Sequence, residues 1–262
     1  MLEIRNLTKT FNAGTINEKV ALDNLSLTLE DGDFVTVIGG NGAGKSTLLN
    51  LIAGVHVPDS GSILLDNTDV TTWKEHNRAQ FLGRVFQDPM MGTAANMQIE
   101  ENLALAARRG KKRGLGWEVT KAEREKYHDM LVSLDLGLED RLSAKVGLLS
   151  GGQRQALTLM MATMVKPKLL LLDEHTAALD PKTAAKVLEI TDKVINENKL
   201  TALMITHNMS DAIKHGNRLI MMNEGKIVYD VSGEEKKNLT VEDLMKKFSE
   251  VGGHFSDRAI LG

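Results

Sequence analysis

The sequence predicts an α/β fold: a parallel-sheet core, an N-terminal antiparallel β subdomain and an inserted α-helical subdomain. Residues 34–38 and 169–172 are runs of β-forming, mostly apolar residues, typical of strands covered on both faces in a parallel sheet. Residues 2–7 and 22–29 alternate between apolar and polar, which favours antiparallel strands with one solvated face. In the middle third of the chain apolar residues recur every three or four positions, which is helical spacing.

Strands and helices alternate on both sides of this helical middle third. We expect strands at residues 2–7, 22–29, 34–38, 61–65, 84–86, 169–172, 202–206 and 219–222. We expect helices at residues 46–53, 99–109, 121–134, 153–165, 181–196 and 240–248. Glu224 and Gly225 predict a hairpin turn into a further strand at 226–228. The elements predict one domain over residues 1–262, with a core at 1–88 and 167–230, a helical subdomain at 89–166 and a short tail at 231–262.

Composition narrows the class of protein. The 262-residue chain is 42% hydrophobic and 26% charged, an ordinary balance for a chain with a buried core. Its net charge is −3, so we expect no nucleic-acid partner, since such partners favour a strongly basic surface. It has no cysteine, which excludes disulfides and thiolate metal sites. No apolar run approaches the roughly 18–20 residues of a membrane span, so any action on a membrane would need another subunit's span.

A glycine-rich segment lies between the strand expected at 34–38 and the helix expected at 46–53. It fits the pattern G-x-x-x-x-G-K-[ST] in full and reads Gly39-Gly40-Asn41-Gly42-Ala43-Gly44-Lys45-Ser46. Glycines let such a loop wrap around phosphate with its N–H groups pointing inward, and the next helix directs its positive end there. Lys45 would reach the β and γ phosphates, and the Ser46 hydroxyl would ligate Mg²⁺. A glycine-rich turn without a ligand is the alternative, and the strand before it and the helix after it argue against that interpretation.

A second pattern ends the apolar strand expected at 169–172. Asp173 and Glu174 follow it, at the carboxyl end of a parallel strand, where ligands bind in such sheets. Asp173 would hold Mg²⁺, mostly through water, and Glu174 would polarise the attacking water as general base. A strand followed by a polar turn is the alternative, and the glycine-rich loop makes it the weaker one.

A third string precedes the amphipathic helix expected at 153–165. It reads Leu149-Ser150-Gly151-Gly152-Gln153 and supplies a second anion-binding helix N-terminus in one chain. One bound nucleotide has a single γ-phosphate, so the second N-terminus is explained if it serves a nucleotide held by another copy. A simple serine cap with flexible glycines remains the alternative for the string in isolation.

These strings, in this order, closely resemble the ABC (ATP-binding cassette) ATPases over roughly residues 1–230. The resemblance implies a P-loop NTPase core of the RecA-like type that hydrolyses ATP with Mg²⁺. It also implies a head-to-tail homodimer that sandwiches two ATP molecules, each touching the phosphate loop of one subunit and Ser150, Gly151 and Gly152 of the other.

The resemblance implies roles for further positions. Phe11 falls where an aromatic residue stacks on adenine, and many members use Tyr there. Gln87 matches the glutamine that contacts Mg²⁺ and senses the transport partner. Asp180 matches the loop that crosses to the opposite subunit, and His207 matches the histidine that contacts the γ-phosphate. Thr47, next to Ser46, belongs with the residues that bind nucleotide.

The resemblance also implies a job. A chain with one cassette and no span is the usual form of importer subunits, so we expect it to power a separate membrane permease from the cytoplasmic side of the membrane. In detail it looks like cassettes paired with permeases for amino acids or related small solutes, often with a substrate-binding lipoprotein. An exporter motor is the main alternative, and a soluble ABC ATPase, a nucleotide kinase and a non-catalytic ATP-binding scaffold are weaker ones.

Three features have no assigned role. Five of the six residues at 108–113 are basic, and they predict either a solvated loop or a contact with lipid headgroups. His175 stands where many family members carry Pro; it could add a polar contact near the attacking water, and no role is assigned to it. The polar stretch at 12–19 is longer than a tight hairpin needs.

Overall fold

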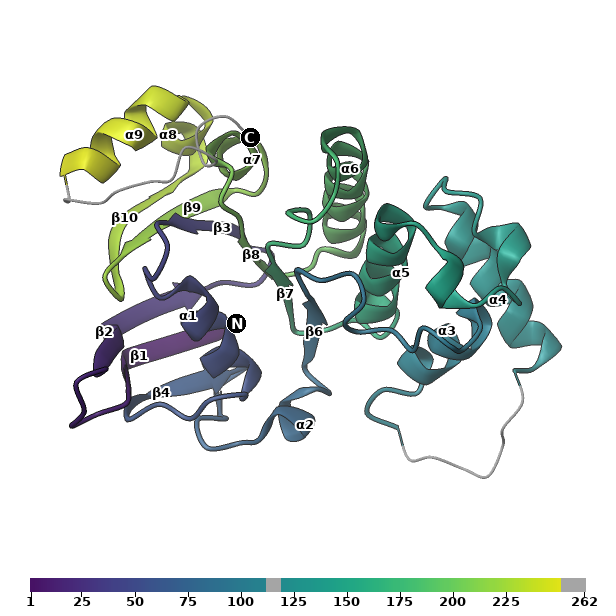
Figure 1. Cartoon of the computed structure of the whole chain (residues 1–262), viewed down its shortest axis with the longest axis horizontal. Helices are drawn as coiled ribbons and strands as arrows, with labels where there is room; N and C mark the ends of the chain where they lie inside the picture. The colour runs from purple at the N-terminus through teal and green to yellow at the C-terminus, as the bar shows by residue number, and fades with distance from the viewer. Residues whose placement is uncertain (112–118, 251–262) are drawn as a thin grey trace.

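The computed structural model describes residues 1–111 and 119–250, which form two sheets and their covering helices (Figure 1). The strands are β1 (Leu2–Phe11), β2 (Lys19–Leu29), β3 (Phe34–Gly39), β4 (Ser60–Leu65), β5 (Thr68–Asp69), β6 (Leu82–Val85), β7 (Leu169–Asp173), β8 (Ala202–Ile205), β9 (Arg218–Asn223) and β10 (Lys226–Ser232). The helices are α1 (Lys45–Ala53), α2 (Glu75–Arg78), α3 (Ile99–Ala107), α4 (Lys121–Val132), α5 (Gly151–Thr163), α6 (Pro181–Asn198), α7 (Met209–Lys214), α8 (Gly233–Lys237) and α9 (Val241–Glu250).

The two sheets confirm the predicted fold class. A four-stranded antiparallel sheet has the order β2-β1-β4-β5, and a six-stranded sheet has the order β10-β9-β3-β8-β7-β6. In the second sheet β9, β3, β8, β7 and β6 run parallel, and β10 joins the edge through the predicted hairpin. Parallel strands need crossovers, and α1, α5, α6 and α7 supply them.

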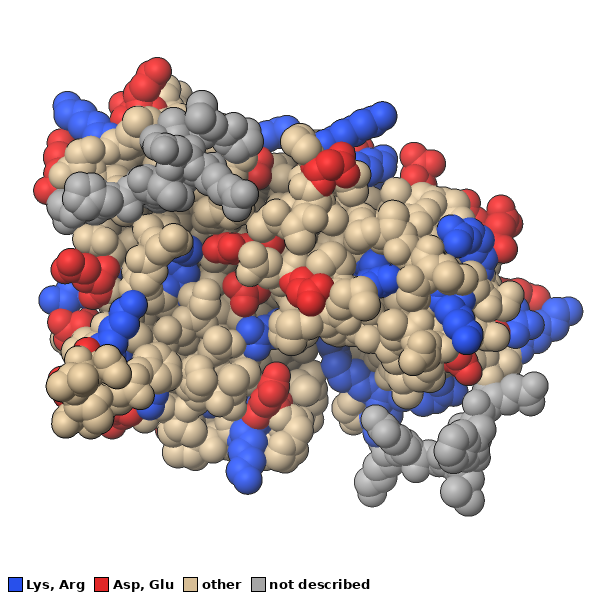
Figure 2. Space-filling model, in the orientation of Figure 1, with Lys and Arg blue, Asp and Glu red and all other residues tan. Residues whose placement is uncertain are grey.

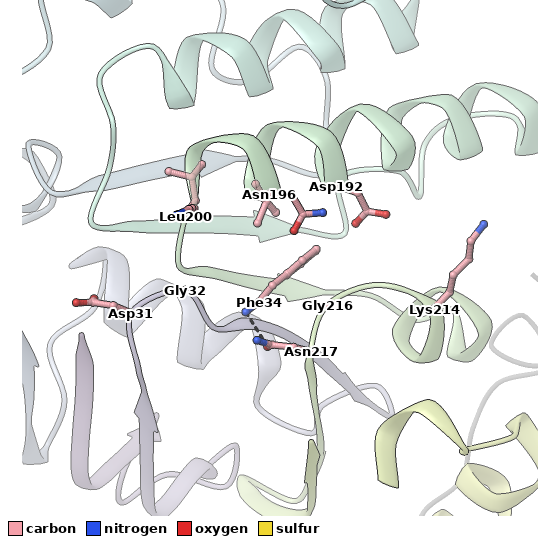
Figure 3. A pocket seen from close by; sticks show the side chains of 11 residues that line it. Asp31, Gly32, Phe34, Asp192, Asn196, Leu200, Lys214, Gly216 and Asn217 are labelled. Atoms are coloured by element: carbon pink, nitrogen blue, oxygen red, sulfur yellow. Dashed lines mark hydrogen bonds between the residues drawn. The ribbon is translucent and has the colours of Figure 1, made fainter. Parts of the chain in front are cut away.

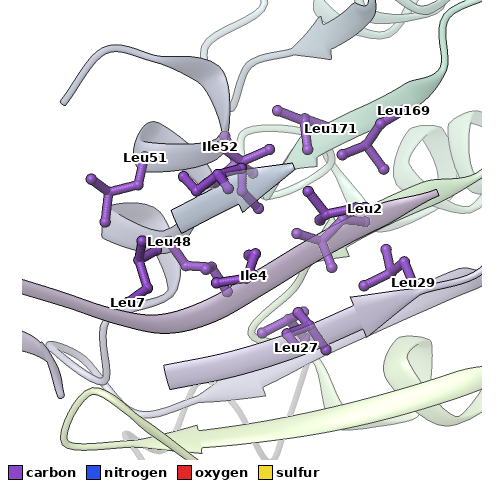
Figure 4. Close-up of a cluster of buried hydrophobic side chains, with 14 of the residues drawn as sticks. Leu2, Ile4, Leu7, Leu27, Leu29, Leu48, Leu51, Ile52, Leu169 and Leu171 are labelled. Carbon is purple, nitrogen blue, oxygen red and sulfur yellow. The ribbon is translucent and has the colours of Figure 1, made fainter. Parts of the chain in front are cut away.

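Each inner strand of the parallel sheet divides its side chains between two hydrophobic clusters. Leu169 and Leu171 of β7 join the cluster that α1 and the antiparallel sheet form, shown in Figure 4. Leu170 and Leu172 point the other way, into the cluster with α3, α5 and α6. The apolar run without alternation is therefore explained by burial on both faces, as the sequence predicts.

Several predicted boundaries were wrong by two or more residues, and three cases show the physical reason. Helix α5 begins at Gly151 rather than Gln153, because Ser150 already caps it. Strand β6 covers Leu82–Val85 rather than 84–86, because its ends are set by pairing with β7, beginning at Leu82↔Leu169. Strands β1 and β2 extend to Phe11 and back to Lys19, so the hairpin between them is shorter than predicted.

Helices α3, α4 and α5 lie together at one side of the sheets (Figure 1). Arg109, predicted to be solvated or lipid-bound, joins these helices to the sheet. Its guanidinium donates to the carbonyls of Leu82 at 3.1 Å, Ala162 at 3.0 Å and Val165, and burial lowers its pKa. Both predictions for Arg109 are wrong, because three backbone carbonyls hold its charge inside. Lys112 and Arg113 lie outside the described residues.

The chain after β9 covers the edge of the six-stranded sheet that lies opposite β6. Leu244 and Phe248 of α9 are buried with residues of α7, β9 and β10 in a third hydrophobic cluster. Helix α9 begins at Val241, close to the predicted start, and Thr240 Oγ1 accepts the N–H of Asp243 at 3.2 Å. Within residues 1–111 and 119–250, no helix is both long and apolar enough to cross a membrane.

Candidate functional site

The glycine-rich loop runs from the end of β3 into α1 and contains backbone that only glycine fits. Gly44, the residue before α1, has φ 101°, and a Cβ there would lie 2.5 Å from the Ala21 carbonyl oxygen. A Cβ on Gly39 would lie 2.3 Å from the carbonyl oxygen of Met222. No side chain caps the start of α1. The first N–H groups of this helix therefore remain available to an anion.

Lys45 opens α1 and its ammonium lies inside the loop. Nζ donates to the carbonyls of Gly39 at 2.7 Å and Gly40 at 3.1 Å. Burial lowers the pKa of this ammonium, while the charges of Glu174 and Asp173 act in the opposite direction. Those two carboxylates therefore lie near the loop, and the structure brings both sequence patterns to one place.

A cavity of about 320 Å³ opens over the loop. It is lined by Phe11, Lys19, Ala21, Asn41, Gly42, Ala43, Gly44, Lys45, Ser46, Thr47 and Glu174. Phe11 lies at one part of this lining, and its ring meets His56 edge-on at a centroid distance of 5.3 Å. The cavity therefore joins an aromatic ring to a phosphate-binding loop, as a nucleotide requires. The sequence did not predict Lys19 and Ala21 as site residues. Lys19 reaches the site because it pairs with Phe11 across strands β1 and β2.

Glu174 follows β7 and faces this cavity. Its backbone has φ 45°, a left-handed conformation that costs a non-glycine residue about 1–2 kcal/mol, and its N–H donates to Ile205 O at 3.0 Å. His207 Nδ1 lies 3.7 Å from Glu174 Oε2, and this imidazole holds the pKa of the carboxyl below its usual value. Glu174 is therefore charged at neutral pH, the form in which it accepts a proton.

Asp173 and Gln87 share a neighbouring cavity of about 640 Å³, which Asn50 and Arg84 also line. Burial raises the pKa of Asp173, and the guanidinium of Arg84, 3.4 Å from Oδ2, opposes that rise. Arg84 also donates to Asn50 Oδ1 at 2.7 Å, which fixes it between β6 and α1. Arg84 was not predicted as a site residue, because nothing in the sequence around it shows which strand lies beside β6.

The string at 149–153 lies elsewhere, and none of its residues lines the cavity over the loop. Ser150 Oγ accepts the N–H of Gln153 at 3.3 Å, and Gln153 Oε1 accepts the N–H of Ser150 at 3.2 Å. A Cβ on Gly152 would lie 2.1 Å from Thr183 Cγ2. Asp180 Oδ1 accepts the Thr183 N–H at 3.1 Å and caps α6. The string and Asp180 thus form one surface, built around the start of α6.

His175 turns away from the cavity. It is fully buried, and its Nε2 lies 3.1 Å from the hydroxyl of Thr191 on α6. That hydroxyl donates to Val187 O at 2.8 Å, so Nε2 carries the proton in this contact. His175, to which the sequence assigned no role, therefore points into the core and not into the cavity.

The oxygen ligands that Mg²⁺ prefers are present beside the loop. Ser46 offers an exposed hydroxyl and Asp173 a carboxylate, and Mg²⁺ is usually held by one or two such groups together with substrate phosphates. The described residues contain no cluster of three His, Cys, Asp or Glu side chains that would hold a metal alone. The donor set therefore fits a magnesium ion that arrives with a phosphate ligand.

A further cavity of about 680 Å³ lies at the opposite end of the parallel sheet (Figure 3). Phe34, the first residue of β3, lines it together with Asp31, Asp192 and Lys214, whereas the phosphate loop follows the last residue of β3. Figure 2 shows positive and negative side chains interspersed over one face of the molecule. Neither feature combines an aromatic ring with an anion-binding loop, so the cavity over α1 is the candidate site.

Comparison with known proteins identifies the class. Residues 22–177 match the family described as ABC transporter. The chain therefore belongs to the ABC transporter family, and it is an ATP-hydrolysing, ATP-binding subunit of such a transporter.

Particular relatives are similar over most of the chain. The tyrosine transport ATP-binding protein of Clostridioides difficile (strain R20291) is 48% identical over 248 residues, which are 95% of this chain and 98% of that protein. The methionine import ATP-binding protein MetN of Corynebacterium diphtheriae is 37% identical, over 91% of this chain and 69% of that protein. The dimeric ATP-binding cassette MJ0796, in a post-hydrolysis state bound to ADP and Pi, aligns with a TM-score of 0.73 and 28% identity over 88% of this chain and 98% of its own.

Proposed function

We propose that this subunit powers the import of a small solute, such as an amino acid, through a separate permease. The observation that carries the proposal is the cavity that joins Phe11, the phosphate loop and Glu174 in a chain similar to the tyrosine and methionine transport subunits. The work is done on the cytoplasmic side of the membrane, where the chain is held through the permease. A substrate-binding lipoprotein delivers the solute from the other side.

In this proposal some residues of the cavity bind the nucleotide and others take part in its hydrolysis. Phe11 stacks on adenine, and the loop from Gly39 to Thr47 binds the phosphates with its N–H groups and Lys45. Glu174, charged and beside His207, orients and deprotonates the water that attacks the γ-phosphate. His207, whose Nδ1 lies 3.7 Å from that carboxylate, contacts the γ-phosphate. Positioning and electrostatics supply most of the rate, as in other phosphoryl transfers.

Mg²⁺ neutralises phosphate charge when bound. Ser46, Asp173 and Gln87 would hold the ion together with the phosphates, and Gln87 and Asp173 line one cavity. Arg84 keeps the Asp173 carboxylate oriented and favours its charged form. Gln87 also senses the permease, as the resemblance to ABC ATPases implies, and the exposed Met91 lines the same cavity.

Two copies complete the site in a head-to-tail homodimer. Ser150, Gly151, Gly152 and Gln153 of one copy contact the γ-phosphate held by the other, and Asp180 crosses the same interface. Support comes from their position outside the cavity of their own chain, on one surface with the start of α6. The dimeric cassette MJ0796 shows that a similar chain forms dimers.

The direction of transport tests this proposal. The chain is assembled with its permease in liposomes, so that the cassettes face outward and ATP is added outside. Labelled tyrosine or methionine, with the lipoprotein, is sealed inside. An importer moves solute from the lumen to the ATP side, and the Glu174→Gln subunit should abolish this loss. Solute gained by the lumen instead would make the protein an exporter motor, and no ATP-dependent movement of either solute would contradict the proposed substrate class.

A further inference from the structure

The polar stretch at 12–19 delivers a lysine to the candidate nucleotide site. It closes the hairpin between β1 and β2, where Phe11 pairs with Lys19. The turn is held by Glu18, whose Oε2 accepts the N–H of Gly14 at 2.6 Å, and by the N–H of Thr15 donating to Asn12 O at 3.1 Å. Lys19 is thereby fixed as the first residue of β2, next to the strand position of the aromatic ring.

The side chain of Lys19 extends from this hairpin across the phosphate loop. A Cβ built on Gly42 would lie 2.9 Å from Lys19 Nζ, so the ammonium lies against the backbone of the loop. Lys19 also lines the cavity that contains Lys45, Ser46 and Thr47. The hairpin and the loop therefore approach the same cavity from two sides, Lys45 from within the loop and Lys19 from outside it.

The charge of Lys19 has no partner in the described part of the chain. No acceptor or carboxylate pairs with its ammonium there, whereas Lys9 on β1 pairs with Asp59 at 2.7 Å and Lys226 on β10 pairs with Asp23 at 2.9 Å. An unpaired cation beside the uncapped start of α1 adds to the positive potential at that helix end. That potential favours a ligand with several negative charges.

We propose that Lys19 is a second cationic contact for the polyphosphate of the bound nucleotide, closing over it from the hairpin. The inference rests on the proposed nucleotide site. It explains why the stretch at 12–19 is longer than a tight turn needs, since the ordered hairpin sets where β2 begins. Lys19 is exposed, so its contribution is a screened charge interaction and should depend on salt.

Nucleotide binding to purified variants tests the role of Lys19. Lys19→Gln removes the charge at similar length, and Lys19→Arg restores it. The matched control is Lys226→Gln, which removes an exposed lysine that is already paired with Asp23. At low salt Lys19→Gln should bind ATP about five- to tenfold more weakly, as expected for one charge at contact distance in a largely aqueous setting. Lys19→Arg and Lys226→Gln should bind within about twofold of wild type.

Two comparisons make the outcome decisive. The loss in Lys19→Gln should shrink at high salt and should be small for AMP, which carries fewer phosphate charges. An equal loss for ATP and AMP, or an unchanged ATP affinity at low salt, would overturn the inference. Lys45→Ala separates this result from failure of the site itself: if Lys45→Ala also leaves ATP binding unchanged, the proposed nucleotide site is wrong, whereas a loss there with none in Lys19→Gln rejects only the role of Lys19.

Discussion

Two helix starts in this chain carry similar serine and glycine residues but differ in how their N–H groups are satisfied. At α1, Gly44 cannot cap the helix, and the loop encloses a cavity that opens on the exposed N–H groups. At α5, Ser150 and Gln153 cap each other reciprocally. A helix N-terminus left without a side-chain cap is prepared for an anion, while a capped one is stable without it.

In the proposed homodimer, this difference would divide nucleotide binding between the two copies. The site at α1 is assembled within one chain, so ATP affinity should be a property of the monomer. The site at α5 is a surface supported by α6, where Thr183 packs on Gly152. Its contribution to nucleotide binding should appear only when a second copy presents a phosphate to it.

The largest expected effect is on the rate of ATP hydrolysis at the α1 site, when the general base is removed and the groups that bind ATP are kept. Glu174→Gln keeps the size of the side chain and loses its charge, and loss of a general base typically lowers the rate by about 10²–10⁴. ATP should still bind, because the loop and Lys45 are unchanged. The measurement is phosphate release with parallel nucleotide titration. Turnover within about threefold of wild type would remove Glu174 from the role of base.

The difference between the starts of α1 and α5 is tested by the change Ser150→Arg in the Glu174→Gln background. A bulky charged side chain at the capped helix start should block contact with the partner's nucleotide, so ATP-dependent dimers should disappear while monomer affinity stays near wild type. Size-exclusion with light scattering, with and without Mg-ATP, reads both states. If Glu174→Gln dimerises and the double variant does so equally well, the string at 149–153 is a local cap. If Glu174→Gln stays monomeric alone, the pair is repeated with the permease present.

A smaller effect is expected at the aromatic side of the first site. A base–aromatic stack is worth roughly 1–3 kcal/mol by alanine substitution, so Phe11→Ala should weaken ATP binding by about five- to 150-fold. Phe11→Tyr should be mild, since the ring is kept. Calorimetric titration and thermal unfolding should be compared for both variants. Unchanged affinity together with unchanged stability in Phe11→Ala would show that the ring neither stacks on the base nor supports the fold.

The last expected effect is on stability rather than on activity, and it concerns His175. His175 joins the end of β7 to Thr191 of α6, the helix that also supports Gly152. Burial lowers the pKa of His175 to about 4. The folded chain therefore favours the neutral ring. The free energy of unfolding should be highest above pH 6.5 and should fall as the pH drops towards 4. At pH 5 the loss should be about 2 kcal/mol.

Urea unfolding at pH 7 and pH 5 measures this loss. His175→Asn removes the titrating ring, so its stability should change less between the two pH values than that of wild type. His76→Asn, at an exposed position on α2, is the matched control and should keep the wild-type difference. An equal pH dependence in wild type and His175→Asn would show that other groups account for the acid sensitivity.

The features that were predicted best from the sequence are formed by residues contiguous in the chain. The glycine loop, the run at 169–172 and Glu174 are each defined by neighbours in sequence, and the expected strand–loop–helix order follows from them. Helix caps were partly predictable. The helix expected at 240–248 begins within one residue of its predicted start and is capped by Thr240. Ser150 was expected to touch phosphate and also closes a capping box on its own helix. The box depends only on residues three apart, so the sequence held enough information to find it.

The sequence by itself determined the fold class, the family and the residues of the phosphate loop, because each depends on local spacing and on burial of whole apolar runs. Tertiary structure alone decided which distant residues meet. Arg84 reaches Asp173 across 89 positions, and Arg109 reaches the carbonyl of Ala162 across 53. It also turned His175 into the core and placed Lys19 over Gly42. Such contacts follow from strand register and helix packing, which are set by the whole core rather than by any short stretch of chain.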